Sequence, residues 1–274
     1  MTVQRLDARL AALASDNRAA FVAYLVAGDP DGQTCLAMVR RLPGAGVDVI
    51  ELGFPFSDPM AEGPPIQRAS RRALAAGMTL KGVLQLARKF RDGDDLTPIV
   101  LMGYLNPLLT HGLEAFARDA AGAGVDGLIV VDCPPEEAGP LADALDAHAL
   151  ALICLAAPTT DDARLGVVSR RAGGFVYYVS VAGVTGVKEA DAATVAPAVA
   201  RARRASGLPV CVGFGIRTPE LAAQVARVAD GVVIGSALVD EITAAIAQNR
   251  DPVSKVLATA GALAKSVHAA RLGG

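Results

Sequence analysis

The sequence predicts a (β/α)8 TIM barrel with an extra N-terminal helix, and three observations support this fold class. Short runs rich in β-branched residues alternate with longer Ala/Leu/Arg-rich segments along the whole chain. There are eight such runs, and parallel strands need helical crossovers between them. The length of 274 residues is close to the roughly 250 residues typical of such a barrel. We therefore expect a single TIM-barrel domain over residues 1–274.

The eight expected strands are almost continuously apolar, which is typical of strands buried on both faces. They cover Phe21–Val26, Val47–Leu52, Pro98–Met102, Gly127–Val131, Ala149–Leu155, Phe175–Val179, Pro209–Val212 and Gly231–Ile234. A doubly wound open sheet is the alternative architecture. That fold favours a glycine fingerprint after the first strand, whereas here the strand is followed by Ala27-Gly28-Asp29-Pro30.

The segments between the strands carry helix signals. Apolar side chains recur every three or four positions over residues 79–90, which predicts an amphipathic helix. Asp29-Pro30 and Thr218-Pro219-Glu220 are expected helix starts, because a capping oxygen stands beside a proline that the first turn tolerates. The stretch Val3–Ala14 also has helical spacing, and we expect it to cap the floor of the barrel.

Composition excludes several classes of protein. A net charge of −2 and an aromatic content of 4% disfavour nucleic-acid and membrane-surface binding, which need basic residues and usually stacking rings. No uncharged apolar run reaches the roughly 18 residues of a membrane span, and the N-terminus lacks the apolar core of a signal peptide. The four cysteines and three histidines lie far apart, so we expect reduced thiols in the cytoplasm and no metal site.

Acidic residues follow the second expected strand, where a barrel places its reactive groups. Glu51 ends an apolar run, so desolvation is expected to raise its pKa toward the range of a general acid. Glu62 follows eleven residues later in a proline-rich loop that also holds Asp58. The loop can return Glu62 over the barrel mouth to face Glu51. A solvated acidic loop is the alternative.

Glycine-rich turns follow the sixth, seventh and eighth expected strands. They are Ser180-Val-Ala-Gly183-Val-Thr-Gly186, Val212-Gly213-Phe-Gly215 and Ile234-Gly235-Ser236. Backbone N–H groups in these loops can converge on a phosphate, although glycines also permit tight turns. None of the five lysines falls at the end of an expected strand, which disfavours a Schiff-base aldolase and leaves acid–base work by carboxylates.

Several motifs follow one another along the chain. They are Glu51-Leu-Gly-Phe-Pro-Phe-Ser-Asp-Pro, Met102-Gly-Tyr-Leu-Asn-Pro107, Gly127-Leu-Ile-Val-Val-Asp-Cys-Pro-Pro-Glu136, Phe175-Val-Tyr-Tyr-Val-Ser, Gly183-Val-Thr-Gly186, Val212-Gly-Phe-Gly-Ile and Gly231-Val-Val-Ile-Gly-Ser-Ala-Leu-Val239. Together these motifs resemble the signatures of the tryptophan synthase alpha subunit family. They keep the family's order and cover nearly the whole chain. The resemblance implies a lyase of tryptophan biosynthesis that splits indole-3-glycerol phosphate into indole and glyceraldehyde 3-phosphate by retro-aldol cleavage. It also implies an alpha2beta2 complex whose beta subunit holds PLP and receives indole, with no cofactor in this chain.

The resemblance also implies roles for individual residues. Glu51 would protonate the indole C3 carbon and then take the glycerol hydroxyl proton, while Glu62 would accept the indole N–H and Tyr177 would lie near both. The phosphate would be bound by Gly186, Gly215, Gly235 and Ser236, and the substrate pocket would include Tyr24, Met102 and Thr185. For the pocket residues, plain packing in the barrel core is the alternative.

Three positions depart from the family pattern. Glu62 stands where the family normally has Asp, Ala182 where a polar residue is usual, and Val26 where Thr is usual. An extra methylene moves the Glu62 carboxylate by about 1 Å, and such a shift can cost about 10²-fold in rate. Two alternatives follow: a weakly active or regulatory subunit that binds the phosphate ligand and activates a beta subunit, and a lyase that works alone.

Overall fold

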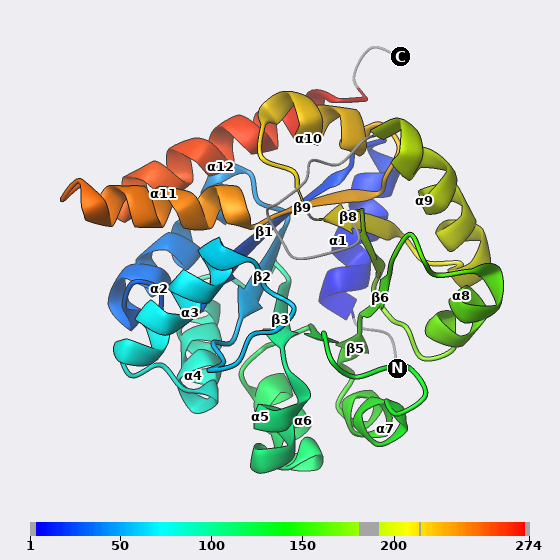
Figure 1. The fold of residues 1–274 in the computed structure, drawn as a ribbon, viewed down its shortest axis with the longest axis horizontal. Coiled ribbons are helices and arrows are strands. Elements are labelled where there is room, and N and C mark those ends of the chain that lie inside the picture. The colour runs from blue at the N-terminus through cyan, green and yellow to red at the C-terminus, as the bar shows by residue number, and fades with distance from the viewer. Residues whose placement is uncertain (1–3, 181–191, 214, 272–274) are drawn as a thin grey trace.

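The computed structural model describes residues 4–180, 192–213 and 215–271, and in these ranges the strands form one parallel sheet that closes into a barrel. Helices surround the ring of strands (Figure 1). The strands are β1 (Ala20–Val26), β2 (Val49–Gly53), β3 (Ile99–Gly103), β4 (Gly127–Val130), β5 (Ala151–Leu152), β6 (Cys154–Ala156), β7 (Val176–Val179), β8 (Val210–Gly213) and β9 (Gly231–Ile234).

The nine short strands form a barrel with eight strand positions, because β5 and β6 are two pieces of one expected strand. β5 pairs with β4, and β6 pairs with β7. The run therefore changes neighbours near Ile153 and closes the ring, which confirms the barrel and excludes the open sheet. The run begins later than expected, since Ala149 has a φ of 56° and belongs to the turn before β5.

The helices alternate with the strands along the chain. They are α1 (Gln4–Ser15), α2 (Gly32–Arg41), η1 (Pro43–Ala45), α3 (Pro64–Ala75), α4 (Leu80–Arg91), α5 (Leu105–His111), α6 (Leu113–Gly122), α7 (Gly139–Ala147), α8 (Asp162–Ser169), α9 (Ala192–Ser206), α10 (Pro219–Ala226), α11 (Ser236–Ala247) and α12 (Pro252–Ala269).

The amphipathic helix expected over residues 79–90 is confirmed, and so is one of the two expected helix starts. The Thr79 side chain accepts a hydrogen bond from Gly82 N–H at the start of α4, and Thr218 caps α10 in the same way. The expectation for Asp29-Pro30 is wrong. Helix α2 begins two residues later, because Asp31 accepts hydrogen bonds from the N–H groups of residues 33 and 34. Asp29 is instead fully buried and forms an ion pair of 2.7 Å with Arg72.

Side chains along each strand alternate between two cores. On β1, Phe21 and Leu25 pack outward against the helices, whereas Val22 and Tyr24 point into the barrel. The inner core also contains leucines of α1, which confirms that the first helix packs against the barrel interior. In Figure 1, α1 crosses the centre of the ring. The same alternation directs Glu51 of β2 inward, beside Tyr24 of β1 in the strand register.

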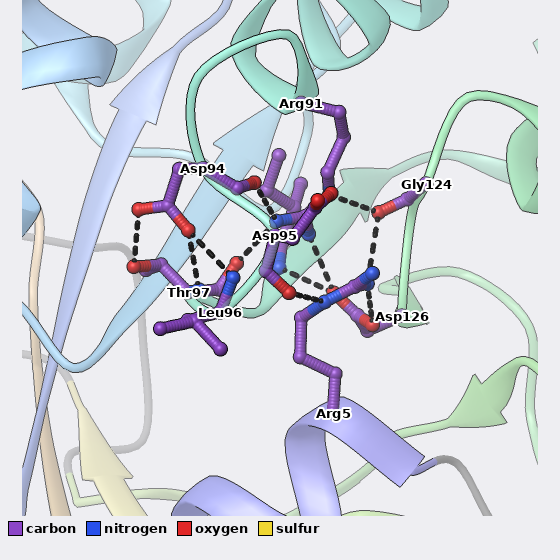
Figure 2. A network of polar contacts seen from close by, with 9 residues as sticks. Arg5, Arg91, Asp94, Asp95, Leu96, Thr97, Gly124 and Asp126 are labelled. Carbon is purple, nitrogen blue, oxygen red and sulfur yellow. Dashed lines mark hydrogen bonds and ion pairs between the residues drawn. The ribbon is translucent and has the colours of Figure 1, made fainter.

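Buried ion pairs hold the floor of the barrel together. Asp126 precedes β4 and binds Arg5 of α1 at 2.5 Å and Arg91 of α4 at 2.9 Å (Figure 2). Its carboxylate also accepts the N–H of Ile99, the first residue of β3, at 2.8 Å. Arg91 in turn donates to the carbonyl of Gly124 at 2.8 Å. The network therefore joins α1, α4 and two strands at the face opposite the strand ends that position the site.

Candidate active site

One cavity opens at the C-terminal ends of the strands, where a barrel carries its reactive groups. It encloses about 490 Å³, counting its open mouth. Its lining residues are Tyr24, Glu51, Glu62, Ile66, Met102, Tyr177, Gly215, Ile216, Arg217, Val233, Gly235 and Ser236. The structure thus brings together eight of the ten residues expected from the sequence. The other two, Thr185 and Gly186, lie outside the described residues.

Glu51 is a buried acid in the wall of this cavity. Its side chain comes from β2 and is 1% exposed. Within the described part of the chain, neither of its carboxyl oxygens has a hydrogen-bond partner. Burial, and then the nearby charge of Glu62, raise the pKa of Glu51 to about 8. Glu51 therefore keeps its proton near neutral pH, as a general acid must.

Glu62 lies against the same cavity, so a fully solvated acidic loop is wrong for this residue. It is 6% exposed, and burial raises the pKa of its carboxyl group to about 7. It lies in the loop between β2 and α3, one residue before the N-cap of that helix. Asp58 in the same loop is exposed and accepts a hydrogen bond from Ser57 at 2.6 Å. The structure thus confirms the expectation that the loop returns Glu62 to the barrel mouth, while Asp58 stays outside the cavity lining.

Tyr104 holds this loop in place. Its phenolic oxygen accepts the N–H of Ala61 at 3.0 Å, next to Glu62. Its ring stacks on Phe56, with centroids 5.0 Å apart. Two contacts from one side chain thus fix the ends of the segment that precedes Glu62. Tyr104 occurs in one of the motifs quoted above, but no spacing or composition signal links it to the loop.

Two tyrosines lie beside the acids. Tyr24 and Tyr177 are buried, and burial raises both pKa values far above that of an exposed tyrosine, so both remain neutral phenols. Glycines make room for their rings. A Cβ atom on Gly53 would lie 2.3 Å from the Tyr24 hydroxyl, and one on Gly213 would lie 2.3 Å from that of Tyr177. Any larger residue at these strand ends would displace the tyrosines.

Backbone groups form the other end of the cavity. Gly215 has a φ of 76°, in the left-handed region that favours glycine. Gly235 is the N-cap of α11 and Ser236 is its first residue, and both line the cavity. Among the described residues, no side chain caps this helix start, so its first-turn N–H groups lack a side-chain partner there. A Cβ on Gly235 would meet the Tyr24 ring at 2.8 Å. Such an uncapped start of a helix suits an anion.

Ile66 and Arg217 line the cavity but were not expected from the sequence. Ile66 lies one turn after Glu62, on the helix that follows the acidic loop. Arg217 lies two residues after Gly215, in the loop after β8. The signal for Arg217 was its distance of two residues from an expected phosphate-binding glycine.

The described residues contain no group of three or more His, Cys, Asp or Glu side chains that could hold a metal ion. Cys35, Cys133, Cys154 and Cys211 are all free. In the described ranges, no helix has both the length and the apolar character of a membrane span.

Fold and site together define a class of protein. A closed parallel barrel with two buried carboxyl groups and a helix start without a capping side chain at its C-terminal mouth is the architecture of a barrel enzyme that works by acid–base chemistry.

Comparison with known proteins identifies the family. The family model for the tryptophan synthase alpha chain matches residues 10–268, and the chain belongs to this family. The curated tryptophan synthase alpha chain of Phenylobacterium zucineum is 70% identical over 271 residues, covering 99% of this chain and 98% of that one. The corresponding protein of Gluconacetobacter diazotrophicus is 53% identical, covering 98% of this chain and all of that one.

Solved structures agree. The crystal structure of tryptophan synthase subunit alpha from Legionella pneumophila str. Paris matches with a TM-score of 0.90 and 41% identity, covering 96% of this chain and 98% of that chain. The chain is therefore a lyase with the alpha-subunit role in tryptophan biosynthesis. These findings do not favour the alternative of a mainly regulatory subunit.

Proposed function

We propose that the cavity cleaves indole-3-glycerol phosphate into indole and glyceraldehyde 3-phosphate, with Glu51 as the acid–base group. One observation carries the proposal: a buried carboxyl group with no hydrogen-bond partner among the described residues stands in the same cavity as a second buried carboxyl group. Burial raises both pKa values, to about 8 for Glu51 and about 7 for Glu62, so we infer that Glu51 carries the proton and that Glu62 ionises first. Two different roles for two acids follow from this split.

The reaction needs a proton on the indole ring before the carbon–carbon bond can break. The Glu51 acid transfers its proton to C3, and the ring becomes cationic. Glu62, as a carboxylate, accepts the indole N–H and stabilises that charge. The Glu51 carboxylate then takes the proton of the hydroxyl on the adjacent glycerol carbon, the C–C bond breaks, and its electron pair restores the neutral indole ring. Glu51 ends protonated, ready for the next cycle.

The other lining residues bind and orient the substrate. Tyr24 and Met102 pack against the indole ring, and Tyr177 lies near the glycerol and Glu51. The N–H groups of Gly215, Gly235 and Ser236 bind the phosphate, supported by the uncapped start of α11. By family membership we extend the phosphate site to Gly186 and the substrate pocket to Thr185.

We also propose that the chain acts in an alpha2beta2 complex in the cytoplasm. In that complex it passes indole to a beta subunit that carries PLP, while this chain itself needs no cofactor. The whole of residues 1–274 acts as one domain in this assembly. Co-purification with a beta subunit tests this against the alternative of a lyase that releases free indole.

The decisive experiment compares Glu51→Gln with the parent protein in indole release from indole-3-glycerol phosphate. Loss of general acid–base catalysis lowers kcat by about 10²–10⁴-fold. Glutamine keeps the shape of the side chain, so circular dichroism and substrate binding serve as controls for folding. Equal rates in the two proteins would overturn the role of Glu51.

A further inference from the structure

One cation faces the cavity at its anion-binding end. Of the described residues that line the cavity, Arg217 alone carries a positive charge. Its side chain is 36% exposed, as expected at a mouth rather than in a core. The same cavity is lined by Glu51, whose buried carboxyl oxygens have no partner in the described part of the chain. An unsatisfied buried acid indicates that a ligand completes this cavity.

Asp240 of α11 holds the Arg217 side chain in position. The Arg217 guanidinium donates a hydrogen bond to the Asp240 carboxylate. Residues four apart lie on the same face of a helix, so Asp240 stands one turn below Ser236 on α11. A guanidinium bound to Asp240 is therefore kept next to the first turn of α11, where Gly235 and Ser236 line the cavity.

The charges at this point leave a positive excess. Arg68 of α3 also approaches Asp240, at 3.9 Å, so two guanidinium groups share one carboxylate. A guanidinium offers five N–H donors, and the Asp240 contact uses only part of them. Arg217 thus retains donors and net charge for a second anion.

We propose that Arg217 binds the phosphate group of the substrate by a charge-assisted hydrogen bond, in addition to the backbone N–H groups, and that Asp240 positions it. This inference rests on the proposed function, since it assigns a further binding residue to the same site. Arginine suits the task because its planar donors match phosphate oxygens. Arg217 acts in binding and touches none of the reacting carbon atoms.

The test compares Arg217→Gln and Arg217→Lys with the parent full-length chain. Arg227 ends α10, is exposed and does not line the cavity, so Arg227→Gln is the matched control. Calorimetric titration with glycerol 3-phosphate measures binding without any chemistry. We expect Kd to rise at least tenfold in Arg217→Gln, less in Arg217→Lys, and not at all in Arg227→Gln. Increasing KCl should weaken binding to the parent more than to Arg217→Gln.

Steady-state kinetics provide a second readout. For indole-3-glycerol phosphate, Arg217→Gln should raise KM at least tenfold with kcat within about threefold of the parent. For the dephosphorylated substrate, parent and variant should have equal kcat/KM. A Kd and KM within twofold of the parent would overturn the proposal, as would equal losses on both substrates or a parent that does not bind glycerol 3-phosphate. If the parent binds it through Arg217 but releases no indole, the proposed function fails while the role of Arg217 stands.

Discussion

The backbone N–H of Ala61 donates a hydrogen bond of 3.0 Å to the phenolic oxygen of Tyr104, and this contact lies directly before Glu62. The side chain comes from the residue after β3, whereas Ala61 belongs to the loop after β2. The side chain of Tyr104, at the end of β3, therefore holds the loop after β2 that carries Glu62.

Removal of the Tyr104 hydroxyl tests this relationship. Tyr104→Phe keeps the ring stack on Phe56 but deletes a hydrogen bond with a net contribution of about 1 kcal/mol. We expect kcat for indole release to fall roughly three- to tenfold because Glu62 is held less firmly. Tyr178, a buried tyrosine of the outer core, supplies the control Tyr178→Phe. An equal loss in both variants would contradict a specific role for Tyr104.

The pH dependence of catalysis follows from the two carboxyl groups. Activity needs Glu51 protonated, so kcat/KM, which reports the free enzyme, should fall as pH rises through about 8. It also needs Glu62 ionised, so kcat/KM should fall as pH drops through about 7. A bell-shaped profile with its maximum between these values is expected, and its two limbs belong to the pair. A profile flat from pH 6 to 9 would contradict this assignment.

The stability of the fold should depend on Glu51 in the same range. Its carboxyl group ionises near pH 4.5 in the unfolded chain but at about 8 in the folded one. Between these values the unfolded chain has released a proton that the folded chain retains, so rising pH lowers the free energy of unfolding. Glutamine does not titrate. The free energy of unfolding of Glu51→Gln relative to that of the parent, measured in urea, should therefore increase by on the order of 3 kcal/mol from pH 5 to pH 8.5. If the difference in free energy of unfolding between variant and parent stays constant with pH, Glu51 is ionised in the folded chain and the prediction fails.

Glu62→Asp tests the departure from the family pattern. The loop of this chain already buries Glu62 against the cavity, and aspartate would withdraw the carboxylate by about 1 Å. We expect kcat for indole release to fall about three- to tenfold. Binding of glycerol 3-phosphate should stay unchanged, which separates a catalytic loss from a folding defect. A gain of more than tenfold would mean that glutamate impairs the lyase, as the regulatory alternative requires.

The floor network should affect stability and leave catalysis alone. Asp126→Asn removes the charge that two arginines share in a buried site (Figure 2), and we expect a loss of about 3 kcal/mol in the free energy of unfolding. The kcat of the folded fraction should not change, since Asp126 lies at the opposite end of the barrel. Asp95→Asn is the control, because Asp95 accepts the Arg5 hydrogen bond through its backbone carbonyl, and its exposed carboxylate acts on Arg91 only through its charge.

The features that depend on local periodicity could be predicted from the amino-acid sequence. Runs of apolar residues predicted the strands of the barrel, and a 3.6-residue repeat predicted α4. The position of Glu51 at a strand end predicted a buried acid at the mouth. These inferences succeed because alternation along a strand, or spacing along a helix, decides which way each side chain points.

Which loop residues contact one another depends on the folded barrel. Asp29 has the sequence signal of a helix cap, but it is buried against Arg72, and Asp31 caps the helix instead. Glu62 faces the cavity while Asp58 stays in solvent. Arg217 is held to α11 by Asp240, across a long gap in the sequence. Contacts between distant loops depend on how the barrel closes, and no spacing along the chain encodes that closure directly.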